Sequence, residues 1–178
     1  DRGRPKGMKD KVPLMRNEEC IELPVDQTSI TKRYADEAIK FISQQAEQKQ
    51  PFFLYLANSM PHTPLFASAQ FEGKSKRGLY GDVIEEIDYN TGRILDHLGK
   101  LNIADNTIVF LSSDNGPALR KRDTGKPDRG GCALPLFEGK HTNFEGGQRV
   151  PAIIRWPGKV PAGSVCTEMV SAMDFLPT

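Results

Sequence analysis

Three short segments of the chain carry residue types that suit binding a charged ligand or moving a proton. The first is Asp114-Asn115-Gly116, where a carboxylate and an amide oxygen stand side by side. Ca²⁺ and Mg²⁺ prefer oxygen ligands, so the pair suits a hard-cation site, although Ca²⁺ takes about six to eight ligands and the others must come from elsewhere. The same residue types favour a turn, because Asp, Asn and Gly tolerate left-handed backbone. Residue type alone leaves both interpretations open.

The second segment is Pro61-His62-Thr63-Pro64. Each proline restricts its own φ and the residue before it, so the pair is expected to hold the imidazole in one direction. Such an imidazole can donate to an anionic substrate or supply a proton to a leaving group. The alternative is a loop histidine that is exposed or hydrogen-bonded. His97 lies opposite the apolar stripe of its predicted helix and is expected at the surface.

The third segment surrounds Lys140, which stands between Gly139 and the run Glu145-Gly146-Gly147. Glycine-rich backbone permits close approach to a ligand. A fixed ammonium suits a sulfuryl or phosphoryl oxygen as a point charge, although a lone lysine is normally a solvated side chain. Glu145 and Arg149 are four residues apart and are expected to pair and brace this loop.

The elements that must position these segments alternate between helix and strand. Apolar residues at spacings of three to four predict a helix over 29–48 and a second one over 83–101. Short apolar runs at 52–56 and 107–111 predict strands buried on both faces. Together they predict an α/β fold with a mostly parallel sheet flanked by helices.

That fold predicts where a ligand would bind, because open α/β sheets hold ligands beyond the carboxyl ends of their strands. The segments with His62 and Asp114 each follow one of the two predicted strands, so both are expected to face one crevice. Residues 150–156 predict a further strand, which Pro151 confines to an edge or a strand start. Residues 117–139 are expected to form a long loop.

Composition excludes several classes of protein. Charged residues make up 26% and hydrophobic residues 38% of the 178, as in an ordinary folded domain. The 24 basic and 23 acidic residues give a net charge of +1, which argues against binding nucleic acid through phosphate neutralisation. No apolar run approaches the roughly 18 residues that span a bilayer. Cys20, Cys132 and Cys166 lack zinc-site spacing and neither require nor exclude a disulfide.

Taken together, these segments resemble the sulfatase family, within the alkaline-phosphatase-like superfamily. The resemblance rests on four stretches in the same order, 51–64, 106–116, 139–151 and 174–178. The stretch Tyr80–Asp88 is similar to the family's helix before the Asp-Asn strand. Four stretches in order make a chance match improbable.

The resemblance implies a role for each candidate residue. Asp114 and Asn115 match two Ca²⁺ ligands, His62 matches a histidine that contacts the sulfate or the leaving-group oxygen, and Lys140 matches a lysine that binds sulfate and assists the leaving group. The family hydrolyses sulfate esters, typically aryl sulfates or sulfated sugars. Its nucleophile is a formylglycine hydrate, made by a formylglycine-generating or sulfatase-maturing enzyme from Cys or Ser in the motif Cys/Ser-x-Pro-x-Arg.

That motif is absent from the sequence. The nearest approach, Ser59-Met60-Pro61, has Thr63 where arginine is required. The early Asp-Asp metal ligands and the Lys-x-His element of the family are absent too. All of these precede the matching stretches in the family, so residues 1–178 are expected to be the central to C-terminal part of a catalytic domain, inactive alone. Family members are usually secreted, periplasmic or lysosomal, but the sequence itself leaves the compartment open.

Two alternatives stand beside a sulfatase. A phosphodiesterase or phosphonate hydrolase of the same superfamily would recruit more His and Asp ligands for transition metals, whereas the Asp-Asn pair and the lysine loop favour the sulfatase. A non-catalytic calcium- or glycan-binding relative would lack the nucleophile throughout. Substrate identity is not fixed by the sequence, although basic residues in the long loop would favour polyanionic sugars: Arg120, Lys121, Arg122, Lys126 and Arg129.

Overall fold

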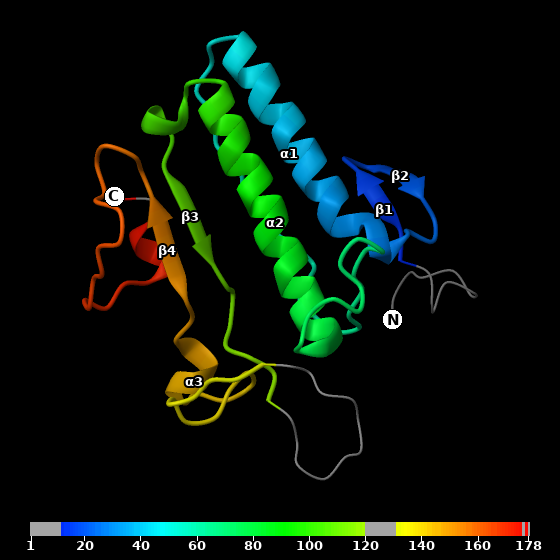
Figure 1. The fold of residues 1–178 in the computed structure, drawn as a ribbon, viewed down its shortest axis with the longest axis vertical. Helices are drawn as coiled ribbons and strands as arrows, with labels where there is room; N and C mark the ends of the chain where they lie inside the picture. The colour runs from blue at the N-terminus through cyan, green and yellow to red at the C-terminus, as the bar shows by residue number, and fades with distance from the viewer. Residues whose placement is uncertain (1–11, 120–130, 176, 178) are drawn as a thin grey trace.

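The computed structural model describes residues 12–119, 131–175 and 177. In these residues, helices α1 (Ile30–Glu47) and α2 (Gly78–Lys100) pack side by side, with one small antiparallel sheet beyond each helix (Figure 1). The helix α3 (Glu145–Gln148) is a single short turn, and 3₁₀ turns lie at Gln27–Ser29, Ala104–Asn106 and Ala172–Asp174. None of the described helices combines the length and the apolar character needed to cross a bilayer.

Helix α1 confirms the helix predicted over 29–48. Asp26 caps the preceding turn, because its Oδ1 accepts from the backbone N–H of Thr28 at 3.0 Å. The apolar positions recur at helical spacing, so one face is buried: Ile30, Ala35, Ala38 and Ile42. That face lies against α2 and forms the first half of the core.

Helix α2 is only partly as predicted. Val83 and Leu98 are buried as expected, but Ile84 is 40% exposed. The buried positions include three polar side chains, Asp82, Glu86 and Asn90. Burying a polar group is costly unless it is hydrogen-bonded, so these positions depend on partners in the loop before the helix and on neighbouring side chains.

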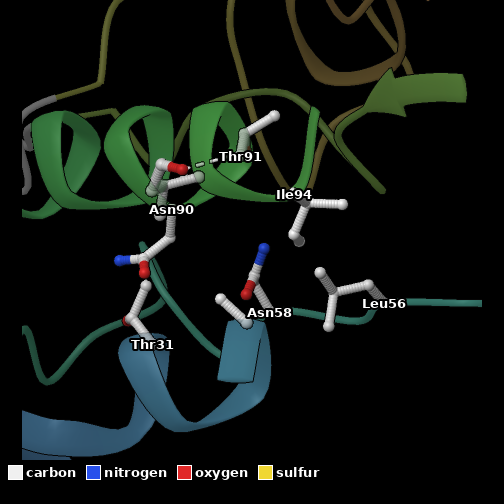
Figure 2. A pocket seen from close by; sticks show the side chains of 8 residues that line it. Thr31, Leu56, Asn58, Asn90, Thr91 and Ile94 are labelled. Carbon is white, nitrogen blue, oxygen red and sulfur yellow. Dashed lines mark hydrogen bonds between the residues drawn. The ribbon is translucent and has the colours of Figure 1, made fainter. Parts of the chain in front are cut away.

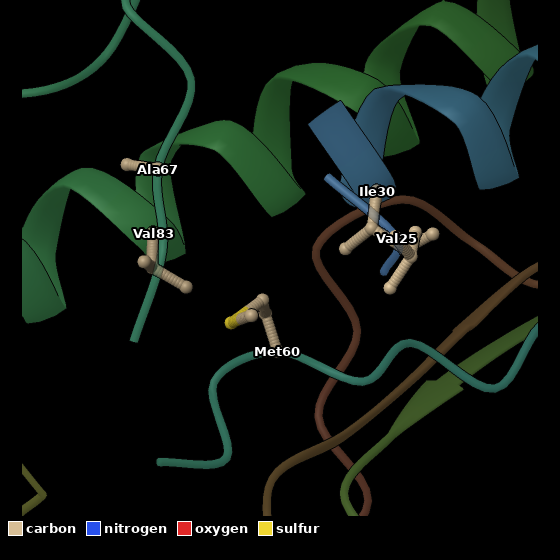
Figure 3. Packing of buried hydrophobic residues seen from close by; sticks show 5 residues of the cluster. All are labelled: Val25, Ile30, Met60, Ala67 and Val83. Carbon is tan, nitrogen blue, oxygen red and sulfur yellow. The ribbon is translucent and has the colours of Figure 1, made fainter. Parts of the chain in front are cut away.

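Residues 59–77 supply those partners. The Oε2 atom of Glu86 accepts from the backbone N–H of Ser68 at 2.8 Å, and Asp82 accepts from the three consecutive N–H groups that start at Gly73. The same stretch contributes apolar side chains to a core cluster with α1 and α2, shown in Figure 3: Val25, Ile30, Met60, Ala67 and Val83. Met60, two residues before His62, is therefore anchored in the core.

Polar contacts join the two helices outside the core. Arg93 of α2 donates to Oδ1 of Asp36 at 2.6 Å and to Oδ1 of Asn90 at 2.9 Å. Further along, His97 Nε2 lies 2.7 Å from Ser43 Oγ of α1. His97 is half-buried, so the prediction of a surface histidine was wrong. The reason is that α1 packs on a face of α2 that was expected to be exposed, because the apolar stripe lies elsewhere on the helix.

The strands pair antiparallel. The hairpin of β1 (Leu14–Arg16) and β2 (Glu19–Glu22) lies near the start of α1, and β3 (Val109–Ser112) pairs with β4 (Ala152–Arg155) beside α2 (Figure 1). The described part of the chain thus contains no parallel pair, and the expected mostly parallel sheet is not found there. Pro151 directly precedes β4, as the prediction of an edge strand or a strand start allows, and β4 pairs on one side only within these residues.

The run at 52–56 was wrongly predicted to be buried on both faces. It carries no strand assignment, and Phe53 and Tyr55 are 86% and 80% exposed. The alternate residues Phe52, Leu54 and Leu56 are half-buried. One face of the run thus packs on the helices, while the other has no covering layer among the described residues.

Candidate functional site

The Asp-Asn-Gly segment lies directly beyond the carboxyl end of β3, as predicted. The hydroxyl of Ser112 donates to the carbonyl oxygen of Pro151 at 3.2 Å, and that of Ser113 donates to the carbonyl oxygen of Asn115 at 2.9 Å. These bonds fix the turn that follows the strand. Asp114 is exposed, Asn115 is half-buried and Gly116 is buried.

The donor atoms of this turn fit a hard cation. Asn115 Nδ2 donates to the carbonyl oxygen of Gly116 at 3.2 Å, and the amide oxygen Oδ1 is the atom of that group that can bind a cation. The Asp114 carboxylate receives no hydrogen bond or ion pair from the residues that the structure describes. Those residues contain no group of three or more His, Cys, Asp or Glu side chains placed to hold a metal. Two oxygen donors alone are too few for Ca²⁺, which takes about six to eight oxygen ligands.

The lysine loop lies against this turn. The backbone N–H of Gly116 donates to the carbonyl oxygen of Gly147 at 2.9 Å, and the N–H of Lys140 donates to the carbonyl oxygen of Pro117 at 2.8 Å. Two segments more than 20 residues apart in sequence are thereby joined through their backbones. The backbone of Lys140 thus lies beside the Asp-Asn-Gly turn, whereas the strand-end argument concerned only His62 and Asp114.

Local backbone geometry shapes the loop around Lys140. Glu138 and His141 have φ values of 62° and 78°, in the left-handed region that non-glycine residues rarely adopt. Arg149 Nη1 lies 2.9 Å from Glu145 Oε2, which confirms the predicted brace. Lys140 lies between these features and is half-buried.

The glycines of the loop do something different from what was expected. They were predicted to let a ligand come close to the backbone. Gly116, Gly139, Gly146 and Gly147 are buried, and each lies against backbone atoms of the two joined segments. A Cβ atom on Gly116 would overlap the carbonyl oxygen of Gly146. Atoms of the protein, mostly backbone, thus occupy the space beside these glycines where a ligand was expected.

His62 lies in the loop at residues 59–64. Its Nδ1 lies 2.7 Å from the carbonyl oxygen of Thr63, and its backbone N–H donates to the carbonyl oxygen of Ser59 at 3.2 Å. A carbonyl oxygen can only accept, so Nδ1 carries the proton and Nε2 faces outward from an exposed ring. Within the described residues, no hydrogen bond joins His62 to Lys140 or to Asp114. Its membership of the same crevice stays a prediction.

Sequence reasoning missed the buried acids of α2 and the mutual packing of the glycines. The acids have a weak signal, since Asp82 and Glu86 lie on the same face as Val83 and Asn90. The glycines have a clearer sequence signal, because Gly116 and Gly139 adjoin candidate residues and the pair Gly146-Gly147 follows Lys140 closely. The three cysteines are exposed and free. The basic residues Arg120, Lys121, Arg122, Lys126 and Arg129 lie outside the described residues.

Comparison with known proteins fits this arrangement. The sulfatase family profile matches residues 6–178. The N-acetylgalactosamine-6-sulfatases of Canis lupus familiaris and Homo sapiens are each 46% identical over 158 residues, which cover 89% of this chain. The steryl-sulfatase of Homo sapiens is 40% identical over 93% of the chain. The chain belongs to the sulfatase family.

Solved structures agree with the sequence relatives. The structure of Ps i-CgsB in complex with k-i-k-neocarrahexaose superposes with a TM-score of 0.71 at 37% identity, covering 85% of this chain and 33% of that protein. The PsFucS1 sulfatase from Pseudoalteromonas sp. gives 0.70 at 28% identity, covering 80% and 29%. The chain spans about three-tenths of the length of the N-acetylgalactosamine-6-sulfatases that it matches.

Proposed function

We propose that the complete protein is a sulfuric ester hydrolase whose site includes Asp114, Asn115, Lys140 and His62. The observation that carries the proposal is the backbone hydrogen bond from Lys140 to Pro117, which joins the backbone of Lys140 to the segment that carries two hard oxygen donors. Membership of the sulfatase family supports the reaction class. A cation and an ammonium at one place suit an anionic group such as a sulfate ester.

Each side chain has a distinct task in this proposal. Lys140 holds a sulfate oxygen as a point charge and stabilises negative charge on the departing oxygen. His62 is tied at Nδ1 to the carbonyl oxygen of Thr63, so only Nε2 is available to exchange a proton with the leaving group. Both act from loops whose backbone is fixed, which limits the reorganisation that the reaction requires.

Asp114 and Asn115 would hold Ca²⁺ together with oxygen ligands from outside this chain. When bound, Ca²⁺ supplies positive charge against the oxygens of the sulfate. The family expectation places the nucleophile, a formylglycine, outside residues 1–178. The complete protein would therefore need a formylglycine-generating or sulfatase-maturing enzyme as a partner.

We further propose that residues 52–57 become a strand of a mostly parallel sheet in the complete protein. Within the described residues, 51–58 make no backbone–backbone hydrogen bond. Leu56 and Asn58 point toward Thr31 of α1 and toward Asn90 and Ile94 of α2 in Figure 2, around a cavity of about 10 Å³. The opposite face, with Phe53 and Tyr55, is exposed. An extended run with one packed face and unpaired backbone suits a strand that neighbouring strands complete.

The substrate class that we propose is a sulfated sugar. Two relatives at 46% identity carry the name N-acetylgalactosamine-6-sulfatase, and a structural neighbour is solved with an oligosaccharide. Aryl sulfates serve as a general probe because they report cleavage of the sulfate ester irrespective of sugar recognition.

The experiment compares the complete, matured protein with its Lys140→Ala variant on an aryl sulfate and on 6-sulfated N-acetylgalactosamine. Loss of a group that stabilises transition-state charge should lower kcat by about 100-fold or more. Lys159→Ala is the matched control, because Lys159 is an exposed lysine remote in sequence from the site and should leave kcat unchanged. An unchanged kcat for Lys140→Ala would remove the lysine from the chemistry.

Parallel assays separate the alternatives. A complete protein that prefers aryl phosphate diesters over aryl sulfates would be a phosphodiesterase of the superfamily. A protein that binds calcium and sulfated sugar but turns over neither ester would be a non-catalytic relative. Either result would overturn the proposed activity.

A further inference from the structure

Four buried glycines, Gly116, Gly139, Gly146 and Gly147, lie where the Asp-Asn-Gly turn meets the lysine loop, and together they form what we call the glycine crossing. Two backbone hydrogen bonds bridge the segments there, from Gly116 to Gly147 and from Lys140 to Pro117. A third, from the N–H of Gly146 to the carbonyl oxygen of Phe137 at 2.9 Å, closes the lysine loop on itself.

The crossing has no room for side chains. A Cβ on Gly146 would overlap the carbonyl oxygen of Glu138 and lie 2.6 Å from that of Phe137. A Cβ on Gly139 would lie 2.5 Å from the carbonyl oxygen of Pro117. The obstructing atoms belong to backbone, which cannot rotate away as the end of a flexible side chain can. A Cβ on Gly116 or Gly139 would therefore push the two segments apart, and one on Gly146 or Gly147 would distort the lysine loop that holds Lys140.

The distance between the segments sets the distance between the candidate groups. Asp114 and Asn115 directly precede Gly116, and Lys140 directly follows Gly139. The short stretches between crossing and functional side chain allow little compensation for a shift of the backbone. A misplacement of about 1 Å can cost about 100-fold in rate.

We propose that the glycine crossing is a positioning device that fixes Lys140 relative to the Asp114–Asn115 pair. The glycines touch no reacting atom in this account and act through the residues beside them. The proposal rests on the proposed sulfatase function, because it assigns the crossing a role in that same site. It predicts that the glycines and Lys140 act as one unit.

The test is a double-mutant cycle in the complete, matured protein with Gly146→Ala, Lys140→Ala and the combined variant. Each single variant should lower kcat/KM on an aryl sulfate by about 100-fold. The combined variant should be no worse than Lys140→Ala alone within about twofold, since a displaced lysine and a missing one are equivalent. Losses that multiply to about 10,000-fold would mean that Gly146 acts independently of Lys140, and would overturn the proposal.

Two further variants keep the test decisive. Gly147→Ala, whose Cβ would lie 2.5 Å from the carbonyl oxygen of Thr142, introduces a milder overlap and carries the cycle if Gly146→Ala does not fold. Gly92→Ala is the matched control, because a Cβ there meets nothing within 4 Å, and its activity should equal that of the parent. A glycine variant of the crossing with full activity would refute the positioning role of the crossing, and the proposed role of Lys140 would stand. An unaffected Lys140→Ala variant would instead refute the proposed role of the lysine, and with it the inference.

Discussion

The backbone N–H of Ser75 donates to Oδ1 of Asp82 at 2.7 Å, so a buried carboxylate of α2 organises the loop that leads into the helix. The two preceding residues, Gly73 and Lys74, donate to the same carboxylate at 2.9 and 3.0 Å. Three donors aimed at one carboxylate favour its ionised form. Asp82 thus holds the end of the stretch between the His62 loop and α2, and Glu86 holds its middle at Ser68.

This arrangement predicts a pH dependence of folding stability. The N–H of Ser75, with those of the two residues before it, lowers the pKa of Asp82 below its ordinary value of 3.8 against the opposing effect of burial. The unfolded chain therefore binds the proton more tightly than the folded chain does. The contribution of Asp82 to stability is complete above about pH 5 and is lost as the pH falls through the lowered folded pKa.

Thermal unfolding of the parent and of Asp82→Asn measures this contribution. The variant should have a Tm lower by several degrees near neutral pH, and the difference should shrink as the pH falls below about 4. Asp88→Asn, at an exposed position of the same helix, should change Tm little at any pH. A Tm difference for Asp82→Asn that is constant down to acid unfolding would contradict the assignment.

A second prediction concerns the link between the helices. Burial alone would raise the pKa of Asp36, but hydrogen bonds from Lys32 and Arg93 outweigh it and lower that pKa. Because the pair is partly exposed, a double-mutant cycle of Asp36→Ala and Arg93→Ala should give a coupling of about 0.5–1 kcal/mol by chemical denaturation. The exposed pair Glu145 and Arg149 should couple by less than about 0.5 kcal/mol. Equal couplings would mean that the Asp36 contact adds nothing beyond a surface pair.

A third prediction distinguishes the buried and exposed isoleucines. Ile42 of α1 is 2% exposed, so Ile42→Ala should lower the free energy of unfolding by about 2–4 kcal/mol through lost packing and a residual cavity. Ile84 of α2 is 40% exposed, and Ile84→Ala should cost less than about 1 kcal/mol. Chemical denaturation of both variants provides the comparison. Similar losses would contradict the observed burial of Ile42 and exposure of Ile84.

The helices followed from local sequence pattern, whereas the sheet did not. Helix α1 was predictable because its apolar residues recur at helical spacing. The burial of Asp82 and Glu86 was not predictable in this way. A search for apolar periodicity treats charged residues as exposed, and it contains no information about loop N–H groups that can hydrogen-bond to them. Strand pairing depends on segments far apart in the chain, so the antiparallel partnership of β3 with β4 was beyond reach of a local argument.

The candidate site divides in the same way. The rule that ligands bind beyond strand ends selected Asp114 from sequence, and the structure places Asp114 directly after β3. The role of the glycines was misjudged, because a glycine signals only that something comes close and not whether it is ligand or backbone. His62 remains a prediction, because loop direction is set by tertiary contacts that two prolines do not determine.

A fourth prediction tests the proposed strand at 52–57. In the complete protein the amide hydrogens of 52–57 should exchange slowly, because neighbouring strands would accept hydrogen bonds from them. The exposed loop at 61–64 provides the comparison and should exchange fast. Hydrogen–deuterium exchange followed by mass spectrometry resolves the two peptides. Exchange of 52–57 as fast as that of the loop would show that the run stays unpaired, and would remove the mostly parallel sheet from the proposal.

The fifth prediction concerns calcium. Asp114 is the charged member of the proposed ligand pair and lies exposed at the end of β3, so Asp114→Ala in the complete protein should raise the calcium concentration for half-saturation by about tenfold or more. Calcium-dependent thermal stabilisation measures this without reference to turnover, because a ligand that binds only the folded state raises Tm. Asp105→Ala, at an exposed acidic position before β3, should leave the calcium midpoint unchanged. If both variants titrate like the parent, Asp114 is a turn residue and not a ligand, and Lys140 would then face a site without its cation.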